Sequence, residues 1–130
     1  MRRTILLTRD PISELWGMPD VAPSTAMGAI VNFHGVVRAT EAGEPIVAIE
    51  YEAHEPMAVH QFGLLMNRVE QNWPQVESVS VVHRLGRVEA GEVSVWVVVV
   101  APHRAEAFAA CQFLIDEMKQ TVPIWKRILR

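Results

Sequence analysis

Hydrophobic residues recur at helical spacing in two segments of the chain. Between Pro56 and Trp73, apolar positions follow one another at steps of three and four residues, which predicts one face of an amphipathic helix. The predicted inner positions are Phe62, Leu65, Met66, Val69 and Trp73. A second helix is predicted after Pro102, ending before Pro123 because proline cannot continue a helix. Its predicted buried face comprises Ala107, Phe108, Cys111, Ile115 and Met118.

Runs rich in β-branched residues predict strands around these helices. The predicted strands cover residues 2–8, 28–37, 46–53, 76–85 and 93–100. Gly35, inside the second run, predicts a bulge or a close approach by another backbone. The last run is so apolar that both of its faces must be covered, and the segment 86–91 would join it to the preceding strand as a turn. We expect this hairpin to be central.

The remaining segments are shorter. Asp10 followed by Pro11 is typical of a helix start and predicts a short helix to about Met18. Residues 40–45, TEAGEP, predict a polar turn, and no element is predicted for the tail PIWKRILR. Two helices covering a mainly antiparallel sheet give an α+β fold, expected as a single domain over residues 1–130. This fold class does not by itself determine a function.

Composition excludes several classes of protein. With 50% hydrophobic and 21% charged residues, the chain is typical of a folded domain, and its net charge of -3 excludes a broadly basic nucleic-acid binder. The longest apolar run, residues 93–101, is about half the length that a membrane-spanning helix needs. The single cysteine, Cys111, allows no internal disulfide and no zinc-ligand spacing, so we expect a cytoplasmic protein. The five histidines show no H-x-x-x-H spacing on one helix, so we expect no metal site, and no other cofactor is expected.

Positive charge gathers near the end of the chain. Four cations fall within its last twelve residues: Lys119, Lys126, Arg127 and Arg130. An anionic ligand could bind there. The ordinary structural explanation is that Lys119, in the last turn of the second helix, only complements the negative end of the helix dipole. A Schiff-base enzyme that uses Lys119 is a further alternative.

Three more basic residues lie where an anion could bind. His103 and Arg104 fall at the start of the second helix, where unpaired N–H groups attract anions. Arg38, at the end of a strand, could hold a phosphate or carboxylate through two hydrogen bonds. All three could equally be solvated surface residues. Cys111 is unsuited as a nucleophile, because burial on an apolar helix face raises the pKa of a thiol. The residues alone therefore predict an anion site.

Several motifs together resemble the large subunit of molybdopterin synthase, over most of the chain from about Gly28. The strand GAIVNFHGVVR, residues 28–38, resembles the family pattern G-A-x-x-x-F-x-G-x-x-R. The other matching segments are Glu50-Tyr51-Glu52 with Met57, His83-Arg84-Leu85-Gly86, Pro102-His103-Arg104 with Ala107-Phe108, and Lys119 with Pro123-Ile124-Trp125-Lys126. They occur in the order and spacing of the family.

The resemblance implies a fold like the α/β hammerhead and a transferase of molybdenum cofactor biosynthesis. Sulfur would pass from a ubiquitin-like small subunit, which carries a thiocarboxylated C-terminal glycine, to cyclic pyranopterin monophosphate, also called precursor Z. The product would be molybdopterin. The resemblance also implies a homodimer of large subunits with one small subunit at each end, which makes a heterotetramer. Both reacting groups are anionic, so the pocket would need positive contacts.

The family pattern assigns roles to the basic residues. Lys119 is the first expected catalytic residue, stabilising or protonating the developing intermediate, with Lys126 beside it. The residues expected to bind substrate in one pocket are Val36, Val37, Arg38, His103, Arg104, Lys119, Lys126, Arg127 and Ile128.

The sequence departs from the family pattern after Arg127. The family usually has an acidic residue there and a further tail containing glycine and tryptophan, whereas this chain has Ile128 and finishes at Arg130. An alternative interpretation follows from this difference. In that interpretation the chain is a non-catalytic, C-terminally shortened relative that binds the small subunit or a pterin.

Overall fold

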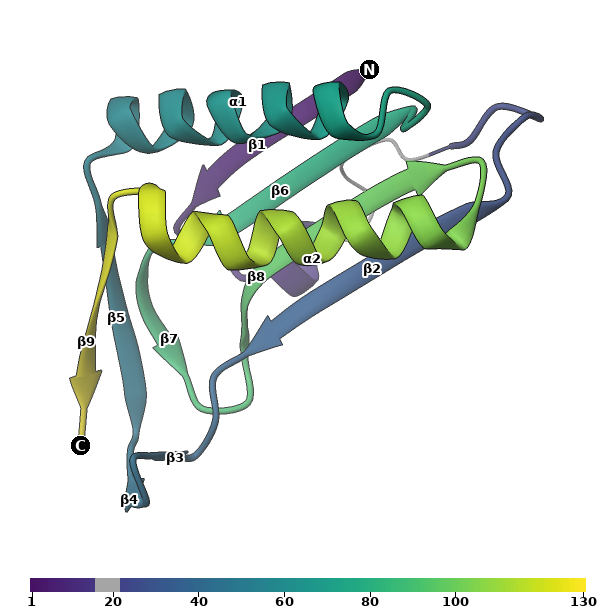
Figure 1. Cartoon of the computed structure of the whole chain (residues 1–130). Helices are drawn as coiled ribbons and strands as arrows, with labels where there is room; N and C mark the ends of the chain where they lie inside the picture. The colour runs from purple at the N-terminus through teal and green to yellow at the C-terminus, as the bar shows by residue number, and fades with distance from the viewer. Residues whose placement is uncertain (16–21) are drawn as a thin grey trace.

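The computed structural model describes residues 1–15 and 22–130. Two α-helices cover one face of a four-stranded sheet, and a three-stranded sheet stands at the end of this layer pair (Figure 1). A short two-stranded hairpin lies beyond the three-stranded sheet (Figure 1). The predicted α+β class is therefore confirmed.

The four-stranded sheet has the order β1-β6-β8-β2. Its strands are β1 (Arg2–Thr8), β6 (Ser78–Arg84), β8 (Val93–Ala101) and β2 (Ala29–Val36). β1 runs parallel to β6, whereas the β6–β8 and β8–β2 pairs are antiparallel. The prediction that β6 and β8 form the centre of the sheet is confirmed, and all residues of β8 after Val93 are buried.

The predicted bulge is present at the end of β2. The register against β8 shifts between Gly35 and Val36. A Cβ atom on Gly35 would lie 2.6 Å from Cγ1 of Val95, so only glycine fits this close approach. Beyond the bulge the chain leaves the sheet, and Val37 packs in a different part of the core from β2.

The first helix, α1 (Glu55–Asn72), follows the predicted pattern. Its buried side chains are Ala58, Phe62, Leu65, Met66 and Val69. Trp73 is the C-terminal cap and is only partly buried, with its ring packed edge-on against Phe113 of the second helix at 5.6 Å.

The second helix, α2 (Arg104–Thr121), buries a slightly different face from the predicted one. Its buried side chains are Ala107, Ala110, Cys111, Leu114 and Met118. The prediction for Phe108 is wrong, because this side chain is 61% exposed. Each residue advances roughly 100° around a helix, which places Phe108 beside the buried stripe rather than on it. Ile115 lies at the same edge and is only partly buried.

The three-stranded sheet has the order β7-β5-β9 and is antiparallel throughout. Its strands are β7 (Gly86–Glu89), β5 (Ala48–Ala53) and β9 (Ile124–Leu129). The segment predicted to be only a turn therefore contains β7, and the tail without a predicted element forms β9. Gly86 has φ of +82°, which lets the chain change direction between β6 and β7.

Two short elements complete the described fold. The predicted polar turn is a tight hairpin of β3 (Thr40–Glu41) and β4 (Glu44–Pro45). Ala42 and Gly43 between them have φ of 52° and 79°, as two-residue hairpin turns require. The helix predicted from Pro11 is a four-residue 3₁₀ helix, η1 (Ile12–Leu15), and the rest of that prediction lies outside the described residues.

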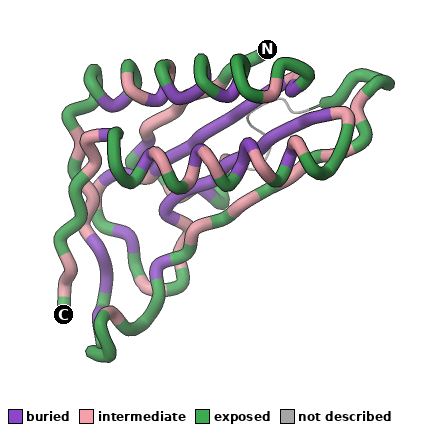
Figure 2. The backbone as a smooth tube through the Cα atoms, viewed as in Figure 1, coloured by how far each residue is buried: buried purple, intermediate pink, exposed green. Residues whose placement is uncertain are grey.

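The buried residues form three clusters, with the largest between the sheet and the two helices (Figure 2). On the opposite face of the sheet, Ile12 of η1 packs with Val82, Trp96 and Val98. The third cluster lies under the three-stranded sheet and comprises Val37, Ile46, Ile49 and Val88, with Ile128 against it. None of the described helices is long and apolar enough to cross a membrane.

Candidate functional site

A pocket of about 410 Å³ opens where the C-terminal end of α2 meets both sheets. Its walls come from β2, β5, β6, β8, β9 and both helices, and most of the lining side chains are apolar. Phe33, Tyr51 and Phe62 supply aromatic surface, and Lys119 and Lys126 supply positive charge. We call this cavity the lysine pocket. An apolar cavity of this size with a few polar groups is typical of a small-molecule site.

The two lysines reach the lysine pocket from different elements. Lys119 lies in the last turn of α2, and Lys126 lies in β9, after the chain has reversed at Pro123. β9 is held in place by β5, in which Tyr51 is the Cα partner of Lys126. The expectation that Lys126 folds back toward Lys119 therefore has a structural basis, the pairing of β9 with β5.

A single carboxylate contacts two of the expected basic residues. Oε1 of Glu41 lies 3.6 Å from Nζ of Lys126, and Oε2 lies 3.7 Å from a guanidinium nitrogen of Arg38. Arg38 is thereby close to the mouth of the lysine pocket, although it does not line it. Lys119 makes no ion pair with any residue in the described part of the chain. Glu41 was not predicted as a site residue, since it lies in an ordinary polar turn.

Val36 and Val37, predicted to bind substrate beside Arg38, lie in different surroundings. Val36 is half exposed and lines the lysine pocket. Val37 is only 3% exposed and packs in the third cluster. Val37 therefore contributes to the core that supports the site rather than to its surface.

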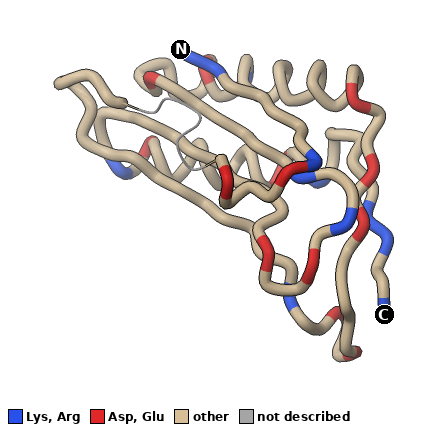
Figure 3. The backbone as a smooth tube through the Cα atoms, turned by 180° about the vertical axis from the view of Figure 1, so that it is seen from behind, with Lys and Arg blue, Asp and Glu red and all other residues tan. Residues whose placement is uncertain are grey.

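The two residues after Lys126 do not line the lysine pocket. Side chains alternate along a strand, so Arg127 points to the opposite face from Lys126. Its guanidinium lies 3.1 Å from Oε1 of Glu50 in β5. Ile128 packs against the third cluster. Lys and Arg residues lie close to Asp and Glu residues around these strands (Figure 3).

His103 and Arg104 lie at the other end of α2. They line a separate, open hollow together with Gly28 and Pro102. Nδ1 of His103 lies 3.1 Å from Oε1 of Glu106. Arg104 and Lys119 are separated by fifteen positions of one helix, or roughly 22 Å at a rise of 1.5 Å per residue. A single chain therefore does not bring His103 and Arg104 to the lysine pocket.

One lining residue was quoted from the sequence only as part of a motif. His83 of β6 is 6% exposed, and its ring packs edge-on against Tyr51 with 5.1 Å between centroids. Nδ1 of His83 lies 2.8 Å from the carbonyl oxygen of Arg84. Burial lowers the pKa of His83, and the hydrogen bond to this carbonyl only partly opposes the shift. The imidazole is therefore neutral near pH 7.

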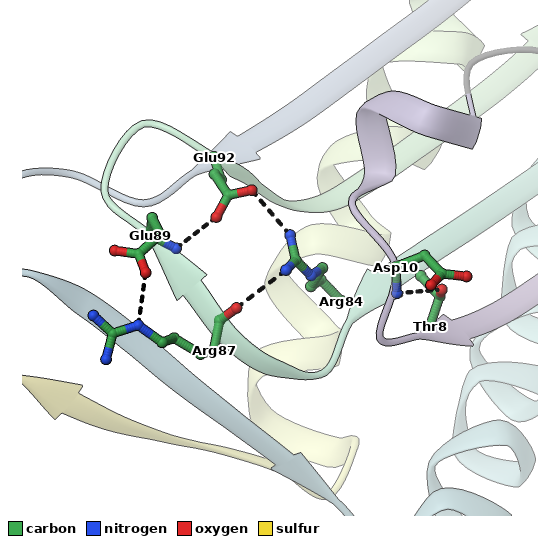
Figure 4. Close-up of polar contacts among 6 residues, drawn as sticks. All are labelled: Thr8, Asp10, Arg84, Arg87, Glu89 and Glu92. Carbon is green, nitrogen blue, oxygen red and sulfur yellow. Dashed lines mark hydrogen bonds and ion pairs between the residues drawn. The ribbon is translucent and has the colours of Figure 1, made fainter.

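The segment after His83 is fixed by a polar network (Figure 4). The guanidinium of Arg84 donates to Oε2 of Glu92 at 3.1 Å and to the carbonyl of Arg87 at 3.2 Å. The backbone N–H of Glu89 donates to Oε1 of Glu92 at 2.9 Å. This N–H bond and the Arg84 contact hold the pKa of Glu92 below its ordinary value. The network joins β6, β7 and the turn that precedes β8, beside the lysine pocket.

Within residues 1–15 and 22–130, no group of three or more His, Cys, Asp or Glu side chains is placed to bind a metal ion. The thiol of Cys111, 4% exposed, has its pKa raised to about 11 by burial. This agrees with the prediction that Cys111 is unsuited as a nucleophile.

Comparison with known proteins places the chain in a family. The model of the family described as MoaE protein matches residues 7–121. The chain belongs to the MoaE family. Among its curated relatives, the molybdopterin synthase catalytic subunit of Nostoc sp. is 44% identical over 107 residues, which are 82% of this chain and 65% of that protein. The match thus spans slightly less than two thirds of the Nostoc protein.

Other MoaE proteins are similar over more of their length. The molybdopterin synthase catalytic subunit of Pyrococcus abyssi is 40% identical over 104 residues, covering 80% of this chain and 70% of that one. The crystal structure of molybdopterin synthase from Staphylococcus aureus superposes with a TM-score of 0.82 at 29% identity, over 97% of this chain and 89% of that one. These similarities confirm the predicted family and fold.

Proposed function

We propose that this chain is the catalytic subunit of a molybdopterin synthase. The proposed reaction transfers sulfur from the thiocarboxylated C-terminal glycine of a ubiquitin-like small subunit to cyclic pyranopterin monophosphate. Its product is molybdopterin, an intermediate of molybdenum cofactor biosynthesis. The observation that carries this proposal is the convergence of Lys119 and Lys126 on one largely apolar pocket, in a MoaE protein whose relatives are named as such catalytic subunits.

Lys119 is the proposed principal catalytic residue. The thiocarboxylate and the pterin phosphate are both anions, and the reaction develops further negative charge as sulfur attacks. An ammonium group beside apolar walls stabilises such charge more strongly than one in water does. Lys119 has no carboxylate partner among the described residues, whereas Lys126 is close to Glu41. Lys126 is the proposed second cation, which helps to hold the anionic group beside Lys119.

The proposed assembly explains why the expected substrate-binding residues lie in two places. His103 and Arg104 are roughly 22 Å along α2 from Lys119, so a second copy of the chain would have to bring them to a lysine pocket. We therefore place them, with Arg38, around the cyclic phosphate in a homodimer of large subunits. Arg127 and Ile128 instead hold β9 in place, through the ion pair of Arg127 with Glu50 and the packing of Ile128 against the third cluster.

The small-subunit partner is part of the same proposal. A similar fold is seen in the Helicobacter pylori complex of subunits 1 and 2 of molybdopterin-converting factor, at a TM-score of 0.76 and 24% identity. This likeness supports the fold, and the partner follows from the family. The proposed complex is a heterotetramer of two large and two small subunits, in which residues 1–130 form the single domain of each large subunit. The single buried Cys111 favours the reducing cytoplasm.

An assay with defined components tests the proposed function. The chain is mixed with thiocarboxylated small subunit and cyclic pyranopterin monophosphate, and mass spectrometry measures the pterin that has gained two sulfur atoms. The expected result is dithiolene product that depends on all three components. No product under conditions in which the Nostoc relative turns over would refute the enzyme assignment. Binding of the small subunit without product would instead support the non-catalytic alternative.

A further inference from the structure

The inner part of the lysine pocket contains a buried polar group, the imidazole of His83, in addition to the two lysines. Lys126 is 54% exposed and Lys119 lies on the surface, so both mark the mouth of the pocket. His83 and Phe62 are 6% and 0% exposed and mark its inner end. A ligand that fills the pocket would therefore meet the imidazole after passing the ammonium groups.

The hydrogen bond of His83 fixes the position of its proton. The carbonyl oxygen of Arg84 can only accept, so Nδ1 of His83 must donate to it across the 2.8 Å contact. In a neutral imidazole the other nitrogen, Nε2, then carries a lone pair and acts as an acceptor. No donor from the described residues reaches Nε2, and this atom is not among the buried polar atoms without a partner. Nε2 is thus an accessible, unused acceptor.

The orientation of this acceptor is also fixed. The ring packs edge-on against Tyr51 of β5, and β5 is itself paired with β7 on one side and β9 on the other. The carbonyl that receives the Nδ1 proton belongs to Arg84, whose guanidinium is held by Glu92 and by the carbonyl of Arg87 (Figure 4). A preorganised acceptor recognises a ligand without first paying to order its own side chain.

We propose that Nε2 of His83 accepts a hydrogen bond from a ring N–H of the pterin substrate and so orients the ring in the lysine pocket. This role rests on the proposed function, and it makes Nε2 of His83 a group that selects the substrate. A reduced pterin has a flat pyrimidinone ring and several N–H donors, which suits a pocket with the aromatic walls of Phe33 and Phe62. A similar ring that offers no N–H at this position would leave the acceptor unpaired and bind more weakly.

Two substitutions separate the two nitrogens of His83. His83→Asn keeps an N–H near Nδ1 for the Arg84 carbonyl and lacks any group at Nε2. His83→Gln can place an amide oxygen close to Nε2. Calorimetric titration with cyclic pyranopterin monophosphate should show binding about tenfold weaker for His83→Asn, the equivalent of about 1.4 kcal/mol, and partial recovery for His83→Gln. His60→Asn, at an exposed position of α1, is the matched control and should bind as the unmodified chain does.

A second measurement on the unmodified chain does not depend on how the variants fold. In ¹⁵N-histidine-labelled protein, the Nε2 resonance of His83 should move upfield when the pterin is added and stay in place with a peptide of the small-subunit tail. Undiminished pterin binding by His83→Asn, or an Nε2 resonance that responds only to the peptide, would overturn the role of His83 and leave the proposed function intact. Failure of the unmodified chain to bind the pterin would overturn both.

Discussion

The two ends of α2 both carry positive side chains, but their surroundings differ. At the N-terminal end, His103 and Arg104 line an open hollow, and His103 contacts the carboxylate of Glu106. At the C-terminal end, Lys119 lines a mostly apolar pocket of about 410 Å³ together with Lys126. The same helix thus presents an exposed cationic surface at one end and a cation beside a cavity at the other.

This difference suits two separate roles for the two ends of α2, as the proposed function requires. The N-terminal end of a helix attracts anions through its free N–H groups, so side-chain cations there would strengthen the attraction for a phosphate. At the C-terminal end the dipole is negative, and the charge that meets a ligand comes from the lysine alone. Apolar walls strengthen the interaction of that lysine with developing charge. This contrast supports the proposal that the first end binds substrate and the second carries the chemistry.

Removal of the Lys119 ammonium should have the largest effect. In Lys119→Ala, the rate of dithiolene formation should fall by about 100- to 1000-fold, as for loss of one group that stabilises transition-state charge. The fold and small-subunit binding should survive because the side chain is exposed. Gln120→Ala, at the next exposed position of α2, is the control and should keep full activity. Full activity of Lys119→Ala would show that the catalytic assignment is wrong.

Arg104→Ala should have a smaller effect of a different kind. Loss of one charge-assisted hydrogen bond costs about 1.5–3 kcal/mol, so the KM for the pterin phosphate should rise tenfold or more while kcat changes less. Steady-state kinetics at varied pterin concentration measure both constants. A fall in kcat at constant KM would place Arg104 in the chemistry and remove the distinction between the two ends of α2.

Glu41→Gln tests whether the carboxylate near Lys126 takes part in the reaction. The ion pair is partly exposed, with side-chain exposures of 54% for Lys126 and 23% for Glu41. Such pairs contribute about 0–1 kcal/mol, so the rate should change by less than about fivefold. A loss comparable to that in Lys119→Ala would instead make Glu41 part of the catalytic group.

The thiol of Cys111, between the two ends of α2, should take no part in the reaction near neutral pH. Its thiol pKa is raised from 9.0 to about 11, so iodoacetamide at pH 8 should label unfolded protein and leave folded protein unlabelled. The unfolded thiol ionises first as pH rises. The stability that the neutral buried thiol contributes should therefore be complete below pH 9 and decline between pH 9 and about 11. Rapid labelling of the folded chain would contradict this placement.

Local patterns predicted the elements whose signal lies within the element itself. The three- and four-residue spacing predicted the inner face of α1, and the glycine at position 35 predicted the bulge in β2. Phe108 was misplaced because it borders the buried stripe of α2 and is itself hydrophobic. β7 was missed because it has only four residues, and β9 because charged residues interrupt its apolar pattern. The pairing of both strands with β5 joins segments far apart in sequence.

The same limit applies to the site. Family motifs predicted Lys119 and Lys126 as site residues, and the pairing of β9 with β5 brings both to one pocket. Glu41 and the unused nitrogen of His83 depend on contacts between segments, which no local pattern encodes. The separation of His103 and Arg104 from Lys119 follows simply from the length of α2, once that helix is known to be continuous.

The most direct test of this assignment is a crystal structure of the chain with cyclic pyranopterin monophosphate bound. The expected result is the pterin ring in the lysine pocket, with Lys119 at its edge and a ring N–H within hydrogen-bond distance of Nε2 of His83. The phosphate should then lie against Arg38 and against His103 and Arg104 contributed by a second copy. A pterin bound away from Lys119 and Lys126 would contradict the proposed site.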